Sequence, residues 1–119
     1  MKVLITGAAG LLGANFTRYL IDKGYDVVGI DDYSGGYKSS VPDGIRMYTQ
    51  DLIEAKKVNE IFENEKPDYV YHFAAYAAEG LSPFIRNYNY TNNILCSINV
   101  INACVNNDIK KIIFTSSMA

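Results

Sequence analysis

The sequence has little of what metal sites and disulfide scaffolds require. His72 is the only histidine, and Cys96 and Cys104 are the only cysteines, among 119 residues. A zinc site built from histidine and cysteine therefore cannot be assembled. Both cysteines fall in one predicted helix, roughly 12 Å apart along its axis at 1.5 Å per residue, which is too far for a disulfide bond. We expect two unpaired thiols that serve as small apolar side chains.

Charge and hydropathy give no support to two classes of partner. The formal net charge is −2, which gives no electrostatic reason to expect a nucleic acid or a membrane surface as a partner. No apolar run reaches the ~18 residues that span a bilayer. The apolar stretch within residues 1–7 is too short for the central region of a signal peptide, and glycines follow it at once. We therefore expect a cytoplasmic protein.

Apolar runs alternate with helical stretches along the whole chain. The expected strands cover residues 2–6, 26–31, 45–49, 69–73 and 111–115. The expected helices cover residues 11–23, 54–65 and 88–106, and residues 32–44 are expected to form a loop. This alternation predicts an α/β fold, a doubly wound parallel sheet of the Rossmann type with helices on both faces. With about five strands, residues 1–119 make most but not all of such a sheet, in one domain.

The strongest local signal is a run of glycines between the first strand and the first helix. Gly7, Gly10 and Gly13 are spaced three residues apart. A helix N-terminus with free backbone N–H groups can receive the pyrophosphate of a dinucleotide, provided that no side chain holds the phosphate away. Gly7 would allow the tight turn, Gly10 the close approach, and Gly13 the packing of the helix on the strand. The alternative is a purely structural turn; a P-loop is excluded because no Gly-Lys-Ser/Thr follows.

An acidic residue closes the second strand. Asp31 lies eighteen residues beyond Gly13, where a carboxylate can accept hydrogen bonds from the adenosine ribose hydroxyls of NAD. The same charge would repel the 2′-phosphate of NADP, and the next basic residue is Lys38. The sequence therefore predicts NAD as the cofactor. The alternative of a solvated turn aspartate stays open, especially for Asp32.

Several short motifs in order make the chain resemble a known family over essentially all 119 residues. It is similar to the extended short-chain dehydrogenase/reductase family, in particular its NAD-dependent nucleotide-sugar epimerase/dehydratase branch and the UDP-glucose 4-epimerase-like group. The matching segments are Thr6–Gly13, Asp31-Asp32, Asp51-Leu52, His72-Phe73-Ala74-Ala75, Asn93 and Thr115-Ser116-Ser117.

This resemblance implies roles for individual residues. Asp51 would hydrogen-bond the adenine amine, although an aspartate three residues before Glu54 can also be a helix N-cap. His72 is expected to be a hydrogen-bonded structural histidine. Ser117 is the expected catalytic serine, which would bond the substrate oxygen at the carbon that undergoes hydride transfer. The expected cofactor contacts are Gly7, Gly10, Leu11, Leu12, Gly13, Asp31, Asp32, Asp51, Leu52, Phe73, Ala74, Ala75, Asn93, Thr115 and Ser116.

The family's acid–base pair, Tyr-x-x-x-Lys, lies well beyond the serine and is missing here. The only such spacing in the sequence is Tyr19–Lys23 in the first helix, where we interpret it as fortuitous. We therefore expect a chain truncated before the catalytic tyrosine and the substrate domain, which binds NAD without turnover. The alternative is a stand-alone NAD-binding regulatory or scaffolding module.

Two further expectations follow from the resemblance. The whole enzyme would act on a nucleotide sugar, and it would form a homodimer through the apolar helix at residues 88–106. Residues 76–81 lack the lysine that approaches the cofactor phosphates in some relatives. This departure leaves open whether the enzyme is an epimerase or a dehydratase.

Overall fold

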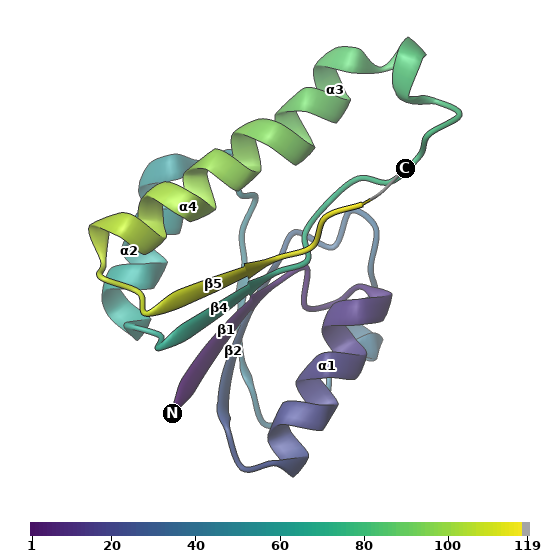
Figure 1. Cartoon of the computed structure of the whole chain (residues 1–119). Coiled ribbons are helices and arrows are strands. Elements are labelled where there is room, and N and C mark those ends of the chain that lie inside the picture. Colours follow the sequence, from purple (N-terminus) through teal and green to yellow (C-terminus); the bar gives the residue numbers. More distant parts are fainter. Residues whose placement is uncertain (118–119) are drawn as a thin grey trace.

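The chain forms one parallel sheet with helices on both faces, as a computed structural model that describes residues 1–117 shows (Figure 1). The five strands are β1 (Lys2–Thr6), β2 (Asp26–Asp31), β3 (Arg46–Thr49), β4 (Tyr69–His72) and β5 (Lys111–Phe114). The α-helices are α1 (Leu11–Asp22), α2 (Ala55–Glu65), α3 (Arg86–Tyr90) and α4 (Cys96–Asn106). The short helical turns are η1 (Lys38–Ser40), η2 (Ser82–Phe84) and η3 (Thr91–Leu95). The predicted fold class and all five predicted strands are confirmed.

The strand order is β3-β2-β1-β4-β5, with every neighbouring pair parallel. The chain moves from β1 toward one edge of the sheet and then returns to the other side of β1, so the connections diverge between β1 and β4. In such sheets ligands bind at the carboxyl ends of the strands beside this divergence. Thr6 is in register with Ile30 on one side and with His72 on the other, which places the residues after three strands at one edge.

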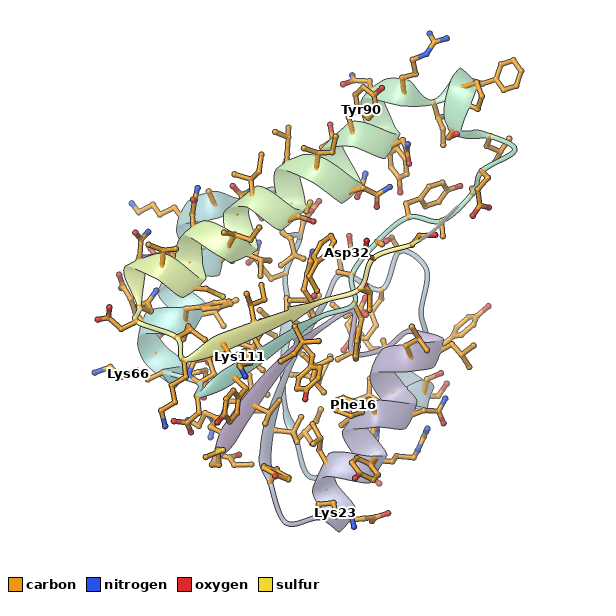
Figure 2. All side chains as sticks on the ribbon, in the orientation of Figure 1. Phe16, Lys23, Asp32, Lys66, Tyr90 and Lys111 are labelled. Atoms are coloured by element: carbon orange, nitrogen blue, oxygen red, sulfur yellow. The ribbon has the colours of Figure 1, made fainter. Side chains whose placement is uncertain are left out.

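Alternate residues of the central strands supply two cores, one on each face of the sheet. Leu4 of β1 packs on the face covered by α2 and α4, together with Phe62 and Val100. Val3 and Ile5 pack on the opposite face with Leu20 of α1, and Phe16 of the same helix packs against them (Figure 2). Figure 1 shows α1 alone on its face, with α2 and α4 side by side on the other. The near-continuous apolar strands are thus buried from both sides, as a parallel sheet requires.

The long helix predicted at residues 88–106 is present but is not uniform. It begins earlier, at Arg86, and passes through a π-helical turn, Thr91–Leu95, before continuing as α4. The two cysteines of this helical stretch are unpaired, as predicted, and both are buried. Among the described residues, no helix combines the length and the apolar character that crossing a membrane demands.

Candidate functional site

The glycines after β1 are required by close backbone approaches. Gly7 has φ +70°, and a Cβ there would lie 2.8 Å from the Ala74 nitrogen. A Cβ on Gly13 would lie 2.0 Å from the Gly7 carbonyl oxygen, so glycine lets α1 pack directly on the turn. Gly10 is different, because its Cβ would meet only the Gly7 oxygen at 3.3 Å. Internal packing therefore explains why Gly7 and Gly13 must be glycine. Packing alone does not require glycine at position 10, which lines the pocket described below.

Asp31 joins the glycine turn to the loop that follows β2. Its Oδ2 accepts a hydrogen bond from the Ala9 N–H at 2.9 Å, and its Oδ1 accepts one from the Tyr33 N–H at 2.8 Å. An ionised carboxylate has about four acceptor sites, so each oxygen can accept a further bond. Asp32 is exposed, and its Oδ1 accepts from both the N–H and the hydroxyl of Ser34. Asp32 thus makes a turn of the kind that its alternative interpretation predicted.

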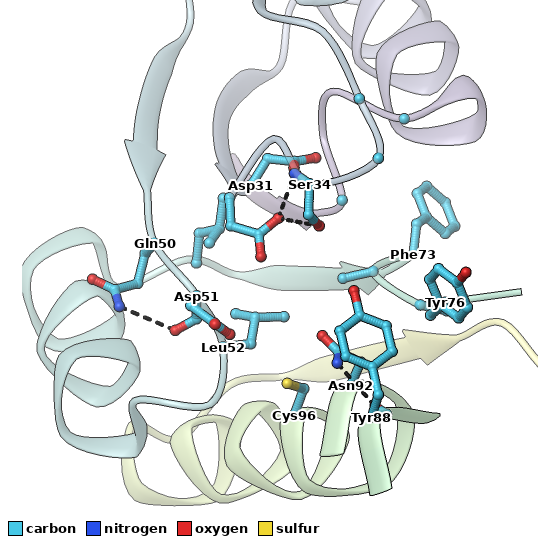
Figure 3. Close-up of a pocket in the computed structure, with 18 residues that line it drawn as sticks. Asp31, Ser34, Gln50, Asp51, Leu52, Phe73, Tyr76, Tyr88, Asn92 and Cys96 are labelled. Atoms are coloured by element: carbon cyan, nitrogen blue, oxygen red, sulfur yellow. Dashed lines mark hydrogen bonds between the residues drawn. The ribbon is translucent and has the colours of Figure 1, made fainter. Parts of the chain in front are cut away.

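A pocket lies at the carboxyl ends of β1, β2, β3 and β4 and is closed on one side by the helical stretch from α3 to α4 (Figure 3). Three aspartates line it, and within residues 1–117 no lysine or arginine does. It brings together nine of the residues predicted from the sequence: Gly7, Gly10, Asp31, Asp32, Asp51, Leu52, Phe73, Ala74 and Ala75.

The other predicted residues lie outside the pocket lining. Leu11 and Leu12 are 82% and 62% exposed and begin helix α1. Thr115 donates a hydrogen bond to the His72 carbonyl oxygen at 3.1 Å. Ser116 and Ser117 follow it and are exposed. The remaining residues outside the lining are Gly13 and Asn93.

Asn93 is a backbone clamp in this structure. Its Oδ1 accepts from the Tyr76 N–H at 2.7 Å, and its Nδ2 donates to the Tyr76 carbonyl at 2.9 Å. The neighbouring Asn92 lines the pocket instead. Asn93 therefore has the structural role that the resemblance implies, and its contact with the cofactor stays a prediction.

Asp51 lines the pocket but does not cap a helix. Its Oδ1 accepts from the Ile53 N–H at 3.0 Å, which forms an Asx turn. Helix α2 begins only at Ala55, and the residue in its cap position is Glu54, whose side chain makes no cap hydrogen bond. The N-cap alternative for Asp51 is therefore wrong, because the chain makes a separate turn before the helix starts.

His72 is structural, as predicted. It is buried between β1 and α4, with Nδ1 2.6 Å from the Thr6 hydroxyl and Nε2 2.9 Å from the Ser97 hydroxyl. The Ser97 hydroxyl donates to a backbone carbonyl and the Thr6 hydroxyl accepts from a backbone N–H, which assigns the ring proton to Nε2. Burial lowers the pKa of His72 to about 4, so the ring is neutral at neutral pH.

Some residues that line the pocket carry no motif that sequence reasoning recognised. Gly36 has a detectable signal, because it lies in a glycine pair soon after Asp31, and a Cβ there would lie 2.5 Å from the Ala9 carbonyl oxygen. Tyr88, Asn92 and Cys96 lie at four-residue spacing on the long helix. The lining residues missed are Ile30, Ser34, Gly35, Gly36, Gln50, Tyr76, Tyr88, Asn92 and Cys96.

The fortuitous Tyr-x-x-x-Lys spacing lies on α1, away from the pocket lining. Tyr19 is half exposed, stacks on Phe16 and has the Lys23 ammonium 5.6 Å from its ring centroid. Nothing in this arrangement brings the tyrosine hydroxyl to the carboxyl edge of the sheet.

Comparison with known proteins agrees with this geometry. The sequence model of the NAD dependent epimerase/dehydratase family matches residues 3–119. A UDP-glucose 4-epimerase from Lactobacillus helveticus is 34% identical over 119 residues, which are all of this chain and 36% of that protein.

Solved structures of epimerases are also similar to this chain. The UDP-glucose 4-epimerase of Thermotoga maritima with UDP-glucose superposes with a TM-score of 0.95 at 30% identity, over 98% of this chain and 38% of that one. The enzyme of Thermus thermophilus in complex with NAD gives the same TM-score, identity and coverage. This chain thus spans little more than a third of the length of the relatives that it matches, and it belongs to the NAD dependent epimerase/dehydratase family.

Proposed function

We propose that this chain binds NAD and forms the cofactor-binding part of a nucleotide-sugar epimerase or dehydratase. The observation that carries the proposal is the pocket itself. It combines an open glycine turn, a strand-end aspartate and a second aspartate after β3, and among its described lining residues it has no basic side chain.

The pyrophosphate would lie against the glycine turn and the N-terminus of α1. Helix α1 begins at Leu11, and the residue in its cap position, Gly10, has no side chain that could cap the helix. The first N–H groups of a helix have no acceptor within the helix, so those of Leu11 and Leu12 can donate to a phosphate there. The helix dipole favours the negative charge at the same place. A side chain on Gly10 would occupy this approach.

The adenosine half of NAD would lie over the ends of β2 and β3. The remaining acceptor sites of Asp31, with Asp32 beside it, suit the ribose hydroxyls. Asp51 would accept from the adenine amine, and Leu52 would pack against the base. The backbone at Phe73–Ala75 passes close to Gly7 and leaves room because Ala74 and Ala75 are small.

The nicotinamide half would extend toward β5, which is the neighbour of β4 in the sheet. Thr115 and Ser116 would line it, and Ser117 would orient the sugar hydroxyl or carbonyl. When bound there, NAD would supply a hydride acceptor for the reversible oxidation of a sugar carbon. The hydroxyl proton needs a positioned base, and in this sequence no Tyr-x-x-x-Lys follows Ser117. His72 is buried and neutral, so these 119 residues are expected to bind NAD without turnover.

An epimerisation assay on UDP-sugars with added NAD tests this assignment. We expect no turnover from the 119-residue chain, and turnover from a longer protein that adds a downstream Tyr-x-x-x-Lys helix and a substrate domain. Comparable turnover by the 119-residue chain would show that the base lies within it. Absence of turnover in both, with NAD bound by both, would contradict the proposed enzyme activity.

We also propose that the chain self-associates through its long helix. Apolar side chains remain exposed along η3 and α4 on the side away from the sheet, which is more apolar surface than one contact face explains. These residues are Ile94, Leu95, Ile98, Ile101 and Val105. Light scattering at increasing concentration should give a dimer mass, and Ile98→Lys should shift it toward the monomer. A monomer mass at every concentration would contradict this.

A further inference from the structure

One wall of the pocket consists of side chains from the helical stretch that ends in α4. Tyr88, Asn92 and Cys96 line the pocket at four-residue spacing, across α3, the π-helical turn and the start of α4. Cys96 is 3% exposed and lies deepest, whereas Tyr88 is 45% exposed and lies at the mouth. Figure 3 shows the Tyr88 ring reaching from the helix over the pocket. An aromatic ring thus stands on the side that the sheet edge leaves open.

The orientation of this ring is fixed by a chain of contacts. Tyr88 packs perpendicular to Tyr76, with ring centroids 5.0 Å apart and an interplanar angle of 88°. Such edge-to-face pairs are a favoured aromatic geometry. The main chain of Tyr76 is held on both its N–H and its carbonyl by the Asn93 amide. Asn93 therefore orients Tyr88 through Tyr76, without lining the pocket itself.

The chemistry of this wall fits a flat base better than a phosphate. Leu52 and Cys96 are buried and apolar, and burial, with the Asp51 and Asp32 charges, raises the pKa of the Cys96 thiol to about 11, so it stays neutral. A phosphate beside these groups would find no lysine or arginine in the described lining. A purine would instead place its faces against apolar and aromatic surfaces and its amine near the Asp51 carboxylate.

We propose that Tyr88 is a cofactor-contacting residue whose ring closes the adenosine half of the pocket, and that Asn93 is a positioning residue that acts through Tyr76. This inference rests on the proposed NAD binding. It assigns to the ring face of Tyr88 a contact with adenosine and gives the hydroxyl no part in it.

Calorimetric titration of the 119-residue chain with NAD, AMP and nicotinamide mononucleotide tests the Tyr88 contact. Tyr88→Ala should weaken NAD and AMP by about the same factor, roughly tenfold for one lost stacking contact, whereas Tyr88→Phe should stay within about twofold. Tyr90→Ala is the matched control, because Tyr90 is also about half exposed on the same helix but does not line the pocket.

Three results would overturn the Tyr88 assignment while leaving NAD binding intact. These are unchanged AMP affinity in Tyr88→Ala, an equal loss in Tyr88→Phe, and a weakening of nicotinamide mononucleotide as large as that of AMP. Failure of the unaltered chain to bind either NAD or AMP would instead contradict the proposed function, and the inference with it.

A double-mutant cycle tests the role of Asn93. Asn93→Ala should weaken AMP binding several-fold in the unaltered chain and have almost no effect in the Tyr88→Ala background, because its influence passes through that ring. Circular dichroism of each variant checks that the fold is retained. Equal losses in both backgrounds would mean that Asn93 acts independently of Tyr88, and would overturn the positioning role.

Discussion

The carboxyl edge of the sheet has two unlike halves. After β2 and β3, the carboxylates of Asp31 and Asp51 line the pocket and accept main-chain N–H bonds. Asp51 accepts within its own turn, whereas Asp31 also accepts from Ala9 in the glycine turn. After β5, Ser116 and Ser117 are exposed and lie outside the pocket lining. The first half is built by hydrogen bonds from main-chain N–H groups to carboxylates and by close backbone approaches between segments that follow neighbouring strands. The described residues enclose the proposed adenosine side but do not enclose the proposed nicotinamide side.

Filling the glycine turn should have the largest effect on cofactor binding. Gly10→Val should reduce NAD affinity by at least about a hundredfold, because the side chain would occupy the phosphate approach. The fold should survive, since Gly10 has φ −79° and a Cβ there meets only one atom, at 3.3 Å. Calorimetry and circular dichroism check the two statements. Gly80→Val is the control, as nothing lies within 4 Å of a Cβ there, and unchanged NAD affinity in a folded Gly10→Val would make the turn purely structural.

Asp31 tests whether the carboxylate has a second role besides tying two loops together. Asp31→Ala should weaken NAD binding by about 1–3 kcal/mol through loss of charge-assisted hydrogen bonds. Asp31→Asn retains an acceptor but removes the charge, so it should narrow the difference in affinity between NAD and NADP. Calorimetric titration of both variants with NAD and with NADP measures these changes in affinity. If Asp31→Asn leaves that difference unchanged, the charge does not select the cofactor.

His72 lies where the two halves meet, and it links stability to pH. The pKa of its buried ring is about 4 in the folded chain, against about 6.5 when unfolded. The unfolded state therefore binds more protons between these values, and the folded state loses stability as the pH falls from about 6.5 toward 4. From pH 7 to pH 5 the free energy of unfolding should drop by about 2 kcal/mol.

Urea denaturation at both pH values measures this drop. As the only histidine in the sequence, His72 accounts for the window above the carboxylate range. His72→Gln should flatten the profile between pH 7 and 5 even though it lowers stability overall. A slope that persists unchanged in this variant would contradict the assignment.

The smallest effect is expected on the other half of the edge. Ser117→Ala in the 119-residue chain should change NAD affinity by less than about twofold, because the serine lies outside the pocket lining and its proposed partner is the substrate. Ser34→Ala is the comparison variant, because Ser34 lines the pocket. A large loss of NAD affinity in Ser117→Ala would place this serine on the cofactor in the absence of substrate.

Features encoded by a few neighbouring residues could be predicted from the sequence. The strands, the glycine turn and Asp31 depend on local patterns, and the pocket brings Gly7, Gly10 and Asp31 together at the predicted edge. The separation of Asp51 from the N-cap of α2 was not predictable, because Asp-x-x-Glu fits a cap and an Asx turn equally well. Deciding between them needs the helix start, which tertiary packing determines.

The helical wall could not be predicted for a different reason. A regular helical period drawn through residues 88–106 assumes one constant rotation per residue. The π-helical turn at Thr91–Leu95 changes that rotation, and within it Asn92 lines the pocket whereas Asn93 clamps Tyr76. No residue type in this segment indicates a π-helical turn, so no sequence signal identified Tyr88 and Cys96 as pocket residues.

Titration with NAD and NADP measures whether the pocket of this chain binds NAD. Calorimetry of the 119-residue chain should show one NAD per chain and NADP bound at least about tenfold more weakly, because the 2′-phosphate would meet aspartates and no basic lining residue within residues 1–117. AMP should bind and compete with NAD. Tighter binding of NADP, or no binding of NAD by a folded chain, would contradict the assignment of the pocket to NAD.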